Sequence, residues 1–322
     1  MSDPTIVVTR RWPGPVEDEL RRRHPGVHLS ASDEPLGEDG LREALRTADV
    51  LLSTVTDRLS ADMLLDSDVR TKFIGNYGVG FSNIDVDAAK RAGIVVTNTP
   101  GVLTDATADL AMTLLLMLAR RAGEGERHVR DHEWSGWRPT HMMGADVTGK
   151  TLGVLGMGRI GSAVARRAHD GFEMPILWFD SFAGAQCDLP GARRTESIEE
   201  VLAGSDFVTL HMPGGDENSH LIGAAELKQM KPNAYLVNTA RGDVVDEVAL
   251  AAALRDGTIA GAGLDVFEHE PQIPEALTSL ENAVLLPHLG SATTGTRIAM
   301  GMLVLENLSA YLSDTEPPCR VV

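Results

Sequence analysis

The sequence predicts an α/β protein built on two doubly wound parallel sheets. Short apolar runs alternate with polar helical stretches through the first hundred residues, and a second alternation begins near Thr151. A glycine-rich turn opens this second part, near the middle of the 322 residues. Because each alternation suits its own sheet, the chain is expected to form two domains of about 150 residues, a usual domain size.

Composition and charge exclude several function classes. Lys and Arg number 29 against 46 Asp and Glu, and the net charge of −17 opposes binding to nucleic acid or anionic lipid. Cys187 and Cys319 have neither metal-ligand spacing nor a dense disulfide framework, which favours a reducing compartment. Met1–Pro4 lacks the features of a signal peptide, and the apolar run Leu110–Ala119 is shorter than the ~20 residues of a membrane span. A soluble, cytoplasmic protein with no nucleic-acid or membrane partner is expected.

The apolar runs of the first hundred residues have the length of buried strands. They are Ile6-Val7-Val8, Val50-Leu51-Leu52, Phe73-Ile74 and Ile94-Val95-Val96. Asn98-Thr99-Pro100-Gly101 then supplies turn chemistry, and the proline-free apolar stretch from Leu103 to Arg121 favours one long buried helix.

Six further strands are expected after Thr151, separated by helical segments. They lie near residues 151–156, 175–179, 206–210, 234–238, 261–265 and 283–286. Six strands with intervening helices fit a doubly wound sheet. A last helical pattern, from about Thr293 to Leu312, is long enough to return to the first domain.

The glycine turn follows an apolar strand and precedes a helical stretch. It reads Gly153-Val154-Leu155-Gly156-Met157-Gly158-Arg159-Ile160-Gly161. Gly156 permits the tight turn, Gly158 lets the backbone approach a pyrophosphate, and Gly161 allows close helix packing. The amides of Arg159 and Ile160 open the helix N-terminus, where a phosphate binds well. This context predicts a Rossmann-like dinucleotide site.

Asp180 indicates which dinucleotide binds. It ends the apolar run Ile176–Phe179, nineteen residues after Gly161. A carboxylate at this place accepts hydrogen bonds from a ribose 2′-hydroxyl and repels a 2′-phosphate, and the next twelve residues contain no Arg or Lys. NAD is therefore expected rather than NADP, although Asp180 can also be interpreted as an ordinary cap at a strand end.

Three later segments place polar or charged residues directly after buried apolar strands. They are Leu236–Gly242, Gly263–Pro271 and Val284–Ser291. Parallel sheets bind ligands at the carboxyl ends of their strands, so the Arg241 guanidinium, the Glu270 carboxylate and the His288 imidazole are expected at one edge. Reduction of a 2-oxo acid needs a cation to hold the carboxylate and polarise the ketone, an acid near neutrality, and a group that tunes this acid. Each residue alone also has an ordinary explanation, as a surface Arg, a loop Glu or a His that caps a strand.

These motifs resemble those of the D-isomer-specific 2-hydroxyacid dehydrogenases, most closely the glyoxylate/hydroxypyruvate reductases, also called D-glycerate dehydrogenases. The resemblance runs from about Asn76 to Ala299, and more weakly through the N-terminal strands. Besides the glycine turn and the three segments, two earlier motifs carry it. They are Asn76-Tyr77-Gly78-Val79-Gly80 with Asn83-Ile84-Asp85, and Asn98-Thr99-Pro100-Gly101-Val102-Leu103-Thr104-Asp105-Ala106-Thr107-Ala108-Asp109.

The resemblance implies roles for individual residues. It assigns a catalytic triad to Arg241, Glu270 and His288. The substrate would contact Arg241 and the backbone of Val79 and Gly80, while Thr54-Val55-Thr56 faces its third carbon and Val55 lines the site. Asp265 would bind the nicotinamide carboxamide. The residues implied to bind the cofactor are Thr107, Gly156, Gly158, Arg159, Ile160, Gly161, Asp180, His211, Met212, Pro213, Thr239, Ala240, Arg241, Asp265, His288 and Gly290.

The resemblance also implies how the domains are organised. A flavodoxin-like substrate domain would comprise residues 1–99 and 289–322, with an NAD-binding Rossmann domain, residues 100–288, inserted into it. In the reductase subgroup Trp134–Pro139 belongs to a dimerisation arm, which implies a homodimer. Residues just beyond that arm can reach the partner's active site, and here they read Thr140-His141-Met142-Met143, without an aromatic residue. His128 and His132 stand four apart but lack a third ligand in register, so no metal is expected.

The leading hypothesis is reversible, NAD(H)-dependent reduction of a small 2-oxo acid, glyoxylate or hydroxypyruvate, to the D-2-hydroxy acid. A small mixed pocket admits both substrates, because one methylene discriminates by only about 1–3 kcal/mol. Two alternatives stay open: a corepressor-like protein that senses NAD and keeps the triad, and a dehydrogenase of another small acid in the same family. Formate dehydrogenases generally carry Gln at the position of Glu270.

Overall fold

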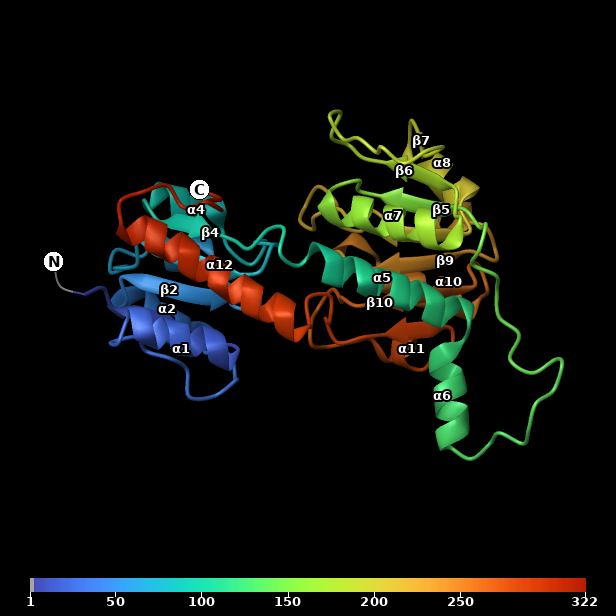
Figure 1. Cartoon of the computed structure of the whole chain (residues 1–322), viewed down its shortest axis with the longest axis horizontal. Helices are drawn as coiled ribbons and strands as arrows, with labels where there is room; N and C mark the ends of the chain where they lie inside the picture. The colour runs from blue at the N-terminus through green and yellow to red at the C-terminus, as the bar shows by residue number, and fades with distance from the viewer. Residues whose placement is uncertain (1–2) are drawn as a thin grey trace. The chain divides into compact units, whose positions relative to one another are not determined.

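A computed structural model describes residues 3–322 of the chain, which divides into two compact units (Figure 1). Unit 1 comprises the residues through Leu103 together with Ala292–Val322, and unit 2 is Thr104–Ser291. The expected boundaries, after residues 99 and 288, fall slightly before these. Each unit has its own parallel sheet, so the α/β fold class is confirmed. Met1 and Ser2, part of the start discussed above, lie outside the described residues.

The sheet of unit 1 has the order β1-β2-β3-β4, with all pairs parallel. A parallel bridge between Val7 and His28 continues it beyond β1, and an antiparallel bridge between Thr97 and Arg320 continues it beyond β4. With His28 counted as the second strand, the parallel order becomes 2-1-3-4-5, the order of flavodoxin-like sheets. The strands are β1 (Ile6–Val8), β2 (Val50–Thr54), β3 (Phe73–Tyr77) and β4 (Val95–Thr97).

Within residues 3–322, five helices pack in unit 1, and the last comes from the C-terminal part of the chain. They are α1 (Gly14–Arg23), α2 (Gly37–Thr47), α3 (Ala61–Leu64), α4 (Val86–Arg91) and α12 (Thr294–Leu312). Thr293 caps α12 by accepting the N–H of Thr296 at 3.1 Å. The helix packs closely on β3, because a Cβ atom on Gly75 would lie 2.8 Å from Val304 Cγ1. The segment from Ala292 onward therefore belongs to unit 1.

The sheet of unit 2 has seven parallel strands in the order β11-β10-β9-β8-β5-β6-β7. Numbered from β5, this is the Rossmann order 3-2-1-4-5-6 with a seventh strand added at one edge. Six strands were predicted. The strand that was not predicted is β7, at the other edge of the sheet, which has only two residues, and its arginines are exposed and form no apolar run. The strands are β5 (Leu152–Leu155), β6 (Ile176–Phe179), β7 (Arg193–Arg194), β8 (Phe207–Leu210), β9 (Tyr235–Asn238), β10 (Gly261–Leu264) and β11 (Ala283–Leu285).

Helices of unit 2 pack on the sheet over two buried apolar clusters. The predicted helix over 103–121 is α5, which ends at Ala119. It packs tightly on β10, since a Cβ atom on Gly263 would lie 3.1 Å from Leu114 Cβ. The helices are α5 (Thr104–Ala119), α6 (Ala122–Arg130), α7 (Arg159–Phe172), α8 (Ile198–Gly204), α9 (Ala224–Gln229), α10 (Glu247–Arg255) and α11 (Glu275–Thr278), with a 3₁₀ turn at Gly242–Val244.

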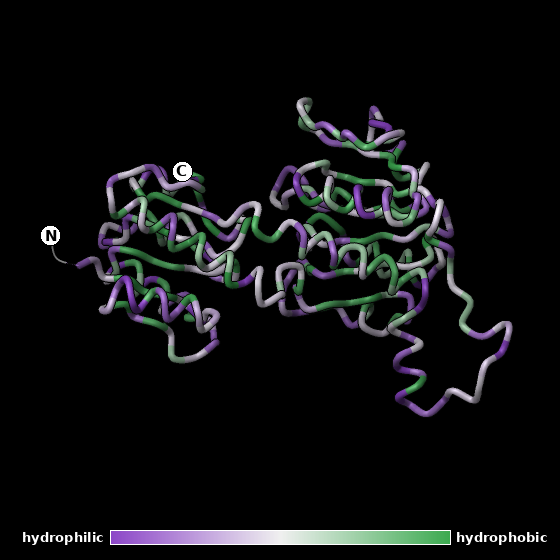
Figure 2. Tube along the Cα trace, viewed as in Figure 1, coloured by the Kyte–Doolittle hydropathy of each residue, from purple (hydrophilic) through white to green (hydrophobic). Residues whose placement is uncertain are grey.

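Helix α6 and the segment after it project from the rest of unit 2 (Figure 1). Figure 2 shows the strands as mostly hydrophobic, whereas α6 and much of this segment are polar. Within it, however, Trp134, Trp137 and Met143 are 55%, 83% and 68% exposed. Across residues 3–322, no helix combines the length and the apolar character needed to cross a membrane.

Candidate active site

The glycine turn joins β5 to α7, and its three glycines differ in what they require. Gly156 has φ +90°, a left-handed conformation that favours glycine. A Cβ atom on Gly161 would lie 2.0 Å from Gly156 O, whereas one on Gly158 would meet nothing within 4 Å. No side chain caps α7 at Gly158, so N–H groups of its first turn remain available to a ligand. This open, uncapped helix start fits a pyrophosphate.

Asp180 connects this turn to the end of β6. Its Oδ2 accepts the N–H of Met157 at 2.8 Å, and its Oδ1 accepts the N–H of Phe182 at 2.8 Å. Arg194, beyond the twelve residues considered above, returns to the same loop and donates to Asp180 O at 3.0 Å and Phe182 O at 3.2 Å. Its guanidinium also lies 5.0 Å from the centroid of the Trp178 ring. The arginine is thus engaged by backbone carbonyls and an aromatic face.

Buried polar atoms without partners lie on the neighbouring strand ends. His211 Nδ1 and Thr239 Oγ1 have no hydrogen-bond partner among the described residues, although His211 Nε2 is 2.9 Å from Thr209 Oγ1. Burial lowers the pKa of His211 to about 3, so this ring is neutral at physiological pH. His211 adjoins the glycine turn, since a Cβ atom on Gly156 would lie 2.7 Å from its carbonyl carbon. Unpartnered polar atoms beside an open helix start are expected where a ligand completes the site.

The predicted imidazole and carboxylate are in direct contact. His288 Nδ1 lies 2.9 Å from Glu270 Oε2, while Glu270 Oε1 accepts the N–H of Phe267 at 3.1 Å. Burial acts to raise the pKa of Glu270, but the hydrogen bond and charge of His288 outweigh it, so this pKa lies below its usual value. Glu270 is therefore ionised at neutral pH and holds His288 Nδ1, while His288 Nε2 has no hydrogen-bond partner among the described residues.

Asp265 holds the turn that presents His288, a role that sequence reasoning did not identify. His288 adopts a left-handed conformation, with φ +54°. The carboxylate of Asp265 accepts the N–H groups of Leu289 at 2.6 Å and Gly290 at 2.8 Å, and its carbonyl accepts the N–H of His288 at 2.9 Å. Thr107 Oγ1 donates to Gly290 O at 3.2 Å. Burial raises the pKa of Asp265, and the two N–H donors offset this only in part.

Arg241 follows β9 and leaves most of its guanidinium donors unused. The buried side chain of Asn238 shapes the turn by donating to Arg241 O at 2.8 Å and accepting the N–H of Ala240 at 3.0 Å. Among the described residues, the guanidinium donates only to Ala240 O, at 2.6 Å. Burial lowers the pKa of Arg241, and the charges of Glu270 and Asp243 offset this only in part. A partly desolvated guanidinium with free donors is suited to a small anion.

The Arg241 turn and the Glu270 loop touch through their backbones. A Cβ atom on Gly242 would lie 1.9 Å from the carbonyl carbon of Phe267 and 2.3 Å from Glu268 N. Buried Glu247 accepts the N–H of Glu268 at 2.9 Å, and His220 Nε2 lies 2.9 Å from Glu268 Oε1. The structure thus brings the three predicted triad residues together at one edge of the unit 2 sheet.

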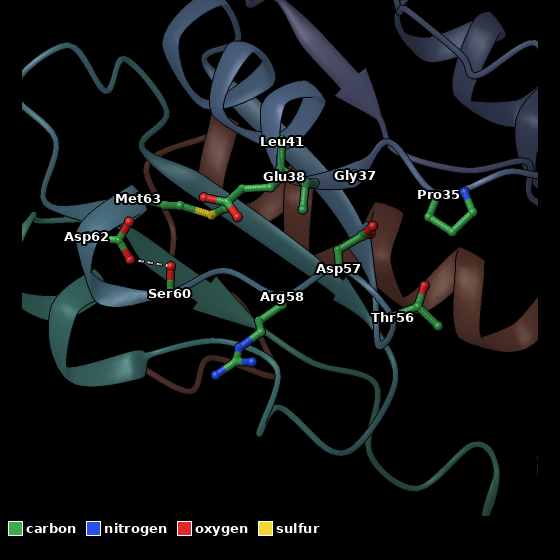
Figure 3. Close-up of a pocket in the computed structure, with 10 residues that line it drawn as sticks. All are labelled: Pro35, Gly37, Glu38, Leu41, Thr56, Asp57, Arg58, Ser60, Asp62 and Met63. Atoms are coloured by element: carbon green, nitrogen blue, oxygen red, sulfur yellow. Dashed lines mark hydrogen bonds between the residues drawn. The ribbon is translucent and has the colours of Figure 1, made fainter. Parts of the chain in front are cut away.

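The predicted substrate residues of unit 1 also meet, in the loops after β2 and β3. A Cβ atom on Gly78 would lie 2.2 Å from Val55 Cγ1, so the side chain of Val55 occupies the space beside the backbone of Gly78. A pocket of about 460 Å³ beneath the β2 loop (Figure 3) is lined by Thr56, Asp57 and Arg58, but Val55, Val79 and Gly80 do not line it.

The two histidines considered as metal ligands do not share a helix face. His132 lies beyond the end of α6, with φ +60°, and His128 Nδ1 bonds to Glu133 Oε2 at 3.0 Å. Within residues 3–322 no group of three or more His, Cys, Asp or Glu side chains is arranged to hold a metal ion.

Known proteins share both the sequence and the fold. Residues 112–290 match the model of the "D-isomer specific 2-hydroxyacid dehydrogenase, NAD binding domain" family. The glyoxylate reductase of Thermococcus litoralis is 48% identical over 321 residues, which cover 98% of this chain and 96% of that protein. A crystal structure of a Thermus thermophilus protein superposes with a TM-score of 0.90 at 43% identity, covering 99% of this chain and 100% of that one.

A third relative is the NADPH-dependent glyoxylate/hydroxypyruvate reductase of Sinorhizobium meliloti, solved with NADP and malonate. It has a TM-score of 0.86 and 33% identity, covering 100% of this chain and 97% of that one. The chain belongs to the D-isomer-specific 2-hydroxyacid dehydrogenase family, and its dinucleotide-binding oxidoreductase class is therefore confirmed.

Replacement of Gly242 by alanine should separate the Arg241 turn from the Glu270 loop. Because the new methyl group would overlap the Phe267 backbone, we expect Gly242→Ala to lower the free energy of unfolding by at least about 2 kcal/mol, as in severe overpacking. Denaturant unfolding measures this. Gly171→Ala is the matched control, because a Cβ atom there meets nothing within 4 Å and should leave stability unchanged or slightly higher. Equal stability of the two variants would contradict the close contact.

Proposed function

We propose that the protein reduces a small 2-oxo acid, glyoxylate or hydroxypyruvate, to the D-2-hydroxy acid with NADH, in a reversible reaction. The observation that carries this proposal is the 2.9 Å contact between His288 and Glu270, on a loop in backbone contact with the Arg241 turn. The names of the relatives, glyoxylate reductase and glyoxylate/hydroxypyruvate reductase, support the substrate class.

His288 acts as the proton donor in this proposal. Glu270 holds Nδ1, which leaves Nε2 to donate to the carbonyl oxygen as the alcohol forms. The ionised Glu270 stabilises the imidazolium before transfer and keeps the ring oriented afterwards. In the reverse direction, neutral His288 accepts the proton from the hydroxy acid.

Arg241 orients the substrate and polarises its ketone. Its unused N–H donors can bind the carboxylate and the carbonyl oxygen together, so the carbonyl carbon becomes a better hydride acceptor. We assign the other contacts to the carboxylate to the backbone of Val79 and Gly80 in unit 1. Val55, held beside Gly78, would limit the size of the group on the third carbon.

We assign the cofactor to the glycine turn and the strand ends of unit 2. The N–H groups of Arg159 and Ile160 would hold the pyrophosphate, and Asp265, Thr239 and His211 would line the nicotinamide end. Bound NADH supplies the hydride. Relatives differ in their nucleotide, since the Sinorhizobium enzyme was solved with NADP. Two observations favour NAD here: Asp180 stands at the end of β6, and the donors of Arg194 are already engaged by carbonyl oxygens.

A substrate panel with NADH and NADPH in parallel tests this function directly. We expect oxidation of NADH with glyoxylate and hydroxypyruvate, and kcat/KM lower by roughly tenfold or more with NADPH, because Asp180 repels a 2′-phosphate. Absorbance at the NADH band measures turnover. A folded preparation that turns over no 2-oxo acid sinks the proposal, and an accompanying change of oligomer size with NADH would favour the NAD-sensing alternative.

Replacement of His288 tests its role as proton donor. We expect His288→Ala to lower kcat for ketone reduction by about 100-fold or more, while NADH still binds, because only the acid is removed. Steady-state kinetics and NADH fluorescence titration measure the two effects. His269→Ala, at an exposed neighbour of Glu270, is the control and should keep normal kcat. Loss of NADH binding without a kcat effect would contradict the assignment.

We further propose a homodimer, formed through the segment after α6. The exposed Trp134, Trp137 and Met143 support this, because large apolar side chains of this kind usually mark an interface.

We also propose a cytoplasmic location, because the two cysteines lie in different units and are both unpaired, as is usual in a reducing compartment.

The double variant Trp134→Ser/Trp137→Ser tests the dimer. We expect the wild type to have the mass of two chains by light scattering and the variant to shift towards one chain on dilution, because the interface loses two aromatic anchors. Phe182→Ser is the control, since Phe182 is 70% exposed in a different loop of unit 2. A monomeric wild type would refute the assignment.

A further inference from the structure

The loop after β3 has three successive carbonyl groups, each held by a different hydrogen bond. Gly78 O accepts the backbone N–H of Thr99 at 3.0 Å. Val79 O accepts Asn98 Nδ2 at 2.7 Å, and Gly80 O accepts Asn76 Nδ2 at 2.9 Å. Two side-chain amides therefore fix the orientation of adjacent peptide groups in unit 1.

Fixing these carbonyls also fixes the N–H groups that follow them. A trans peptide is planar, so its N–H points opposite to its C=O. Because the carbonyl oxygens of residues 78–80 are held, each of the N–H groups of Val79, Gly80 and Phe81 points away from the donor that holds the carbonyl before it. None of the hydrogen bonds within residues 3–322 uses one of these three N–H groups. Val79 and Gly80 are half-buried and Phe81 is exposed, so this loop reaches the surface of unit 1.

Asn83 fixes the direction of the Asn76 amide. Asn83 Nδ2 lies 3.4 Å from Asn76 Oδ1, so the Asn76 oxygen faces Asn83 and its nitrogen faces Gly80. The same Nδ2 donates to Thr54 O at 3.2 Å and Asp57 O at 3.0 Å, which links this loop to the one after β2. Asp57, labelled in Figure 3, completes the link by accepting the N–H of Thr54 at 2.7 Å. The two loops that carry Val55 and Val79 are thus one hydrogen-bonded structure.

We propose that Asn76 and Asn98 are positioning residues, which turn the N–H groups of Val79, Gly80 and Phe81 outward to bind the carboxylate of the substrate. The inference rests on the proposed function, because it supplies the carboxylate contact which that function needs. Asparagine suits this task because its NH₂ donates to a carbonyl at any pH between about 5 and 9, unlike a histidine. Aspartate at either position would face a carbonyl oxygen with another acceptor.

The first variant to test is Asn98→Ala, because Asn98 is only partly buried and its loss should leave the fold intact. We expect KM for glyoxylate to rise roughly tenfold while kcat changes less than about threefold, since binding is lost and chemistry is not. NADH affinity should stay at the wild-type value. Asn76→Asp should raise KM further, because it replaces a donor with an acceptor and adds a negative charge near the carboxylate.

The matched control is Asn282→Ala in unit 2. The Asn282 amide holds two carbonyls, those of Leu254 at 3.2 Å and Ala260 at 3.2 Å, where the Asn98 amide holds one, and it lies far along the chain from the loop after β3. This variant loses the same kind of hydrogen bond as Asn98→Ala. We therefore expect its thermal midpoint to fall about as far as that of Asn98→Ala, while KM for glyoxylate stays unchanged. If Asn282→Ala raised KM as much as Asn98→Ala does, the effect of Asn98→Ala would come from a loss of stability and not from a loss of positioning.

Calorimetric binding of oxamate in the presence of NADH separates this inference from the proposed function. Oxamate carries the carboxylate of a 2-oxo acid but is not reduced, and uncharged oxamide is its control. We expect wild type to bind oxamate and not oxamide, and Asn98→Ala to bind oxamate at least tenfold more weakly, whether or not any 2-oxo acid is turned over. Equal oxamate affinity in the two proteins, or none in wild type, overturns the inference; absence of turnover with normal oxamate binding overturns only the function.

Discussion

Parallel strand pairing is the constraint on which the site in unit 2 depends. All seven strands run the same way, so every strand enters its following loop at the same edge of the sheet. The glycine turn after β5 and the turns after β9, β10 and β11 therefore lie at the same edge of the sheet, although the chain separates them widely. Contact between the Arg241 turn and the Glu270 loop then requires a residue without a side chain, and Gly242 meets this need. The left-handed backbone of His288 costs about 1–3 kcal/mol, and the two N–H bonds to Asp265 compensate for it.

Much of this arrangement is predictable from the sequence because it depends on short-range patterns. Buried strands have apolar runs, and the loops after them carry the polar residues, so each strand in unit 2 except β7 was predicted within about two residues. The family motifs identified Arg241, Glu270 and His288. The positioning groups were not predictable in this way. The side chains concerned are those of Asp265, Asn238 and Asn98, and each forms hydrogen bonds with backbone atoms. Only the folded chain brings these backbone atoms close to the Asp265 and Asn98 side chains. In the sequence, an Asn beside a turn looks the same whichever carbonyl it binds.

Arg194 illustrates the difference between distance along the chain and distance in space. A window of twelve residues after Asp180 contains no basic residue, yet the pairing of β7 with β6 places Arg194 opposite Trp178 in the sheet register. A cation beside the end of β6 would ordinarily favour a 2′-phosphate. Here its guanidinium donates to four carbonyl oxygens, those of Asp180, Phe182, Ala183 and Ala185, and lies over an aromatic ring. Binding a phosphate would break several of these bonds, so Arg194 supports the proposed preference for NAD for a reason that the sequence did not contain.

The carboxylate contacts proposed in the two units differ in their electrostatics, and the net charge of the chain bears on both. At −17 the protein repels a small carboxylate at long range, although salt screens this beyond about 8 Å at physiological ionic strength. Attraction must therefore be local. In the proposed function Arg241 would supply it in unit 2 with a full charge, whose attraction for an anion is limited because Glu270 and Asp243 lie near it. The amides of Val79, Gly80 and Phe81 in unit 1 would supply it with fixed dipoles, which do not titrate. A lysine in their place would bind more tightly but would pair with any acidic neighbour, whereas N–H groups held by Asn76 and Asn98 remain free for a ligand of the right shape.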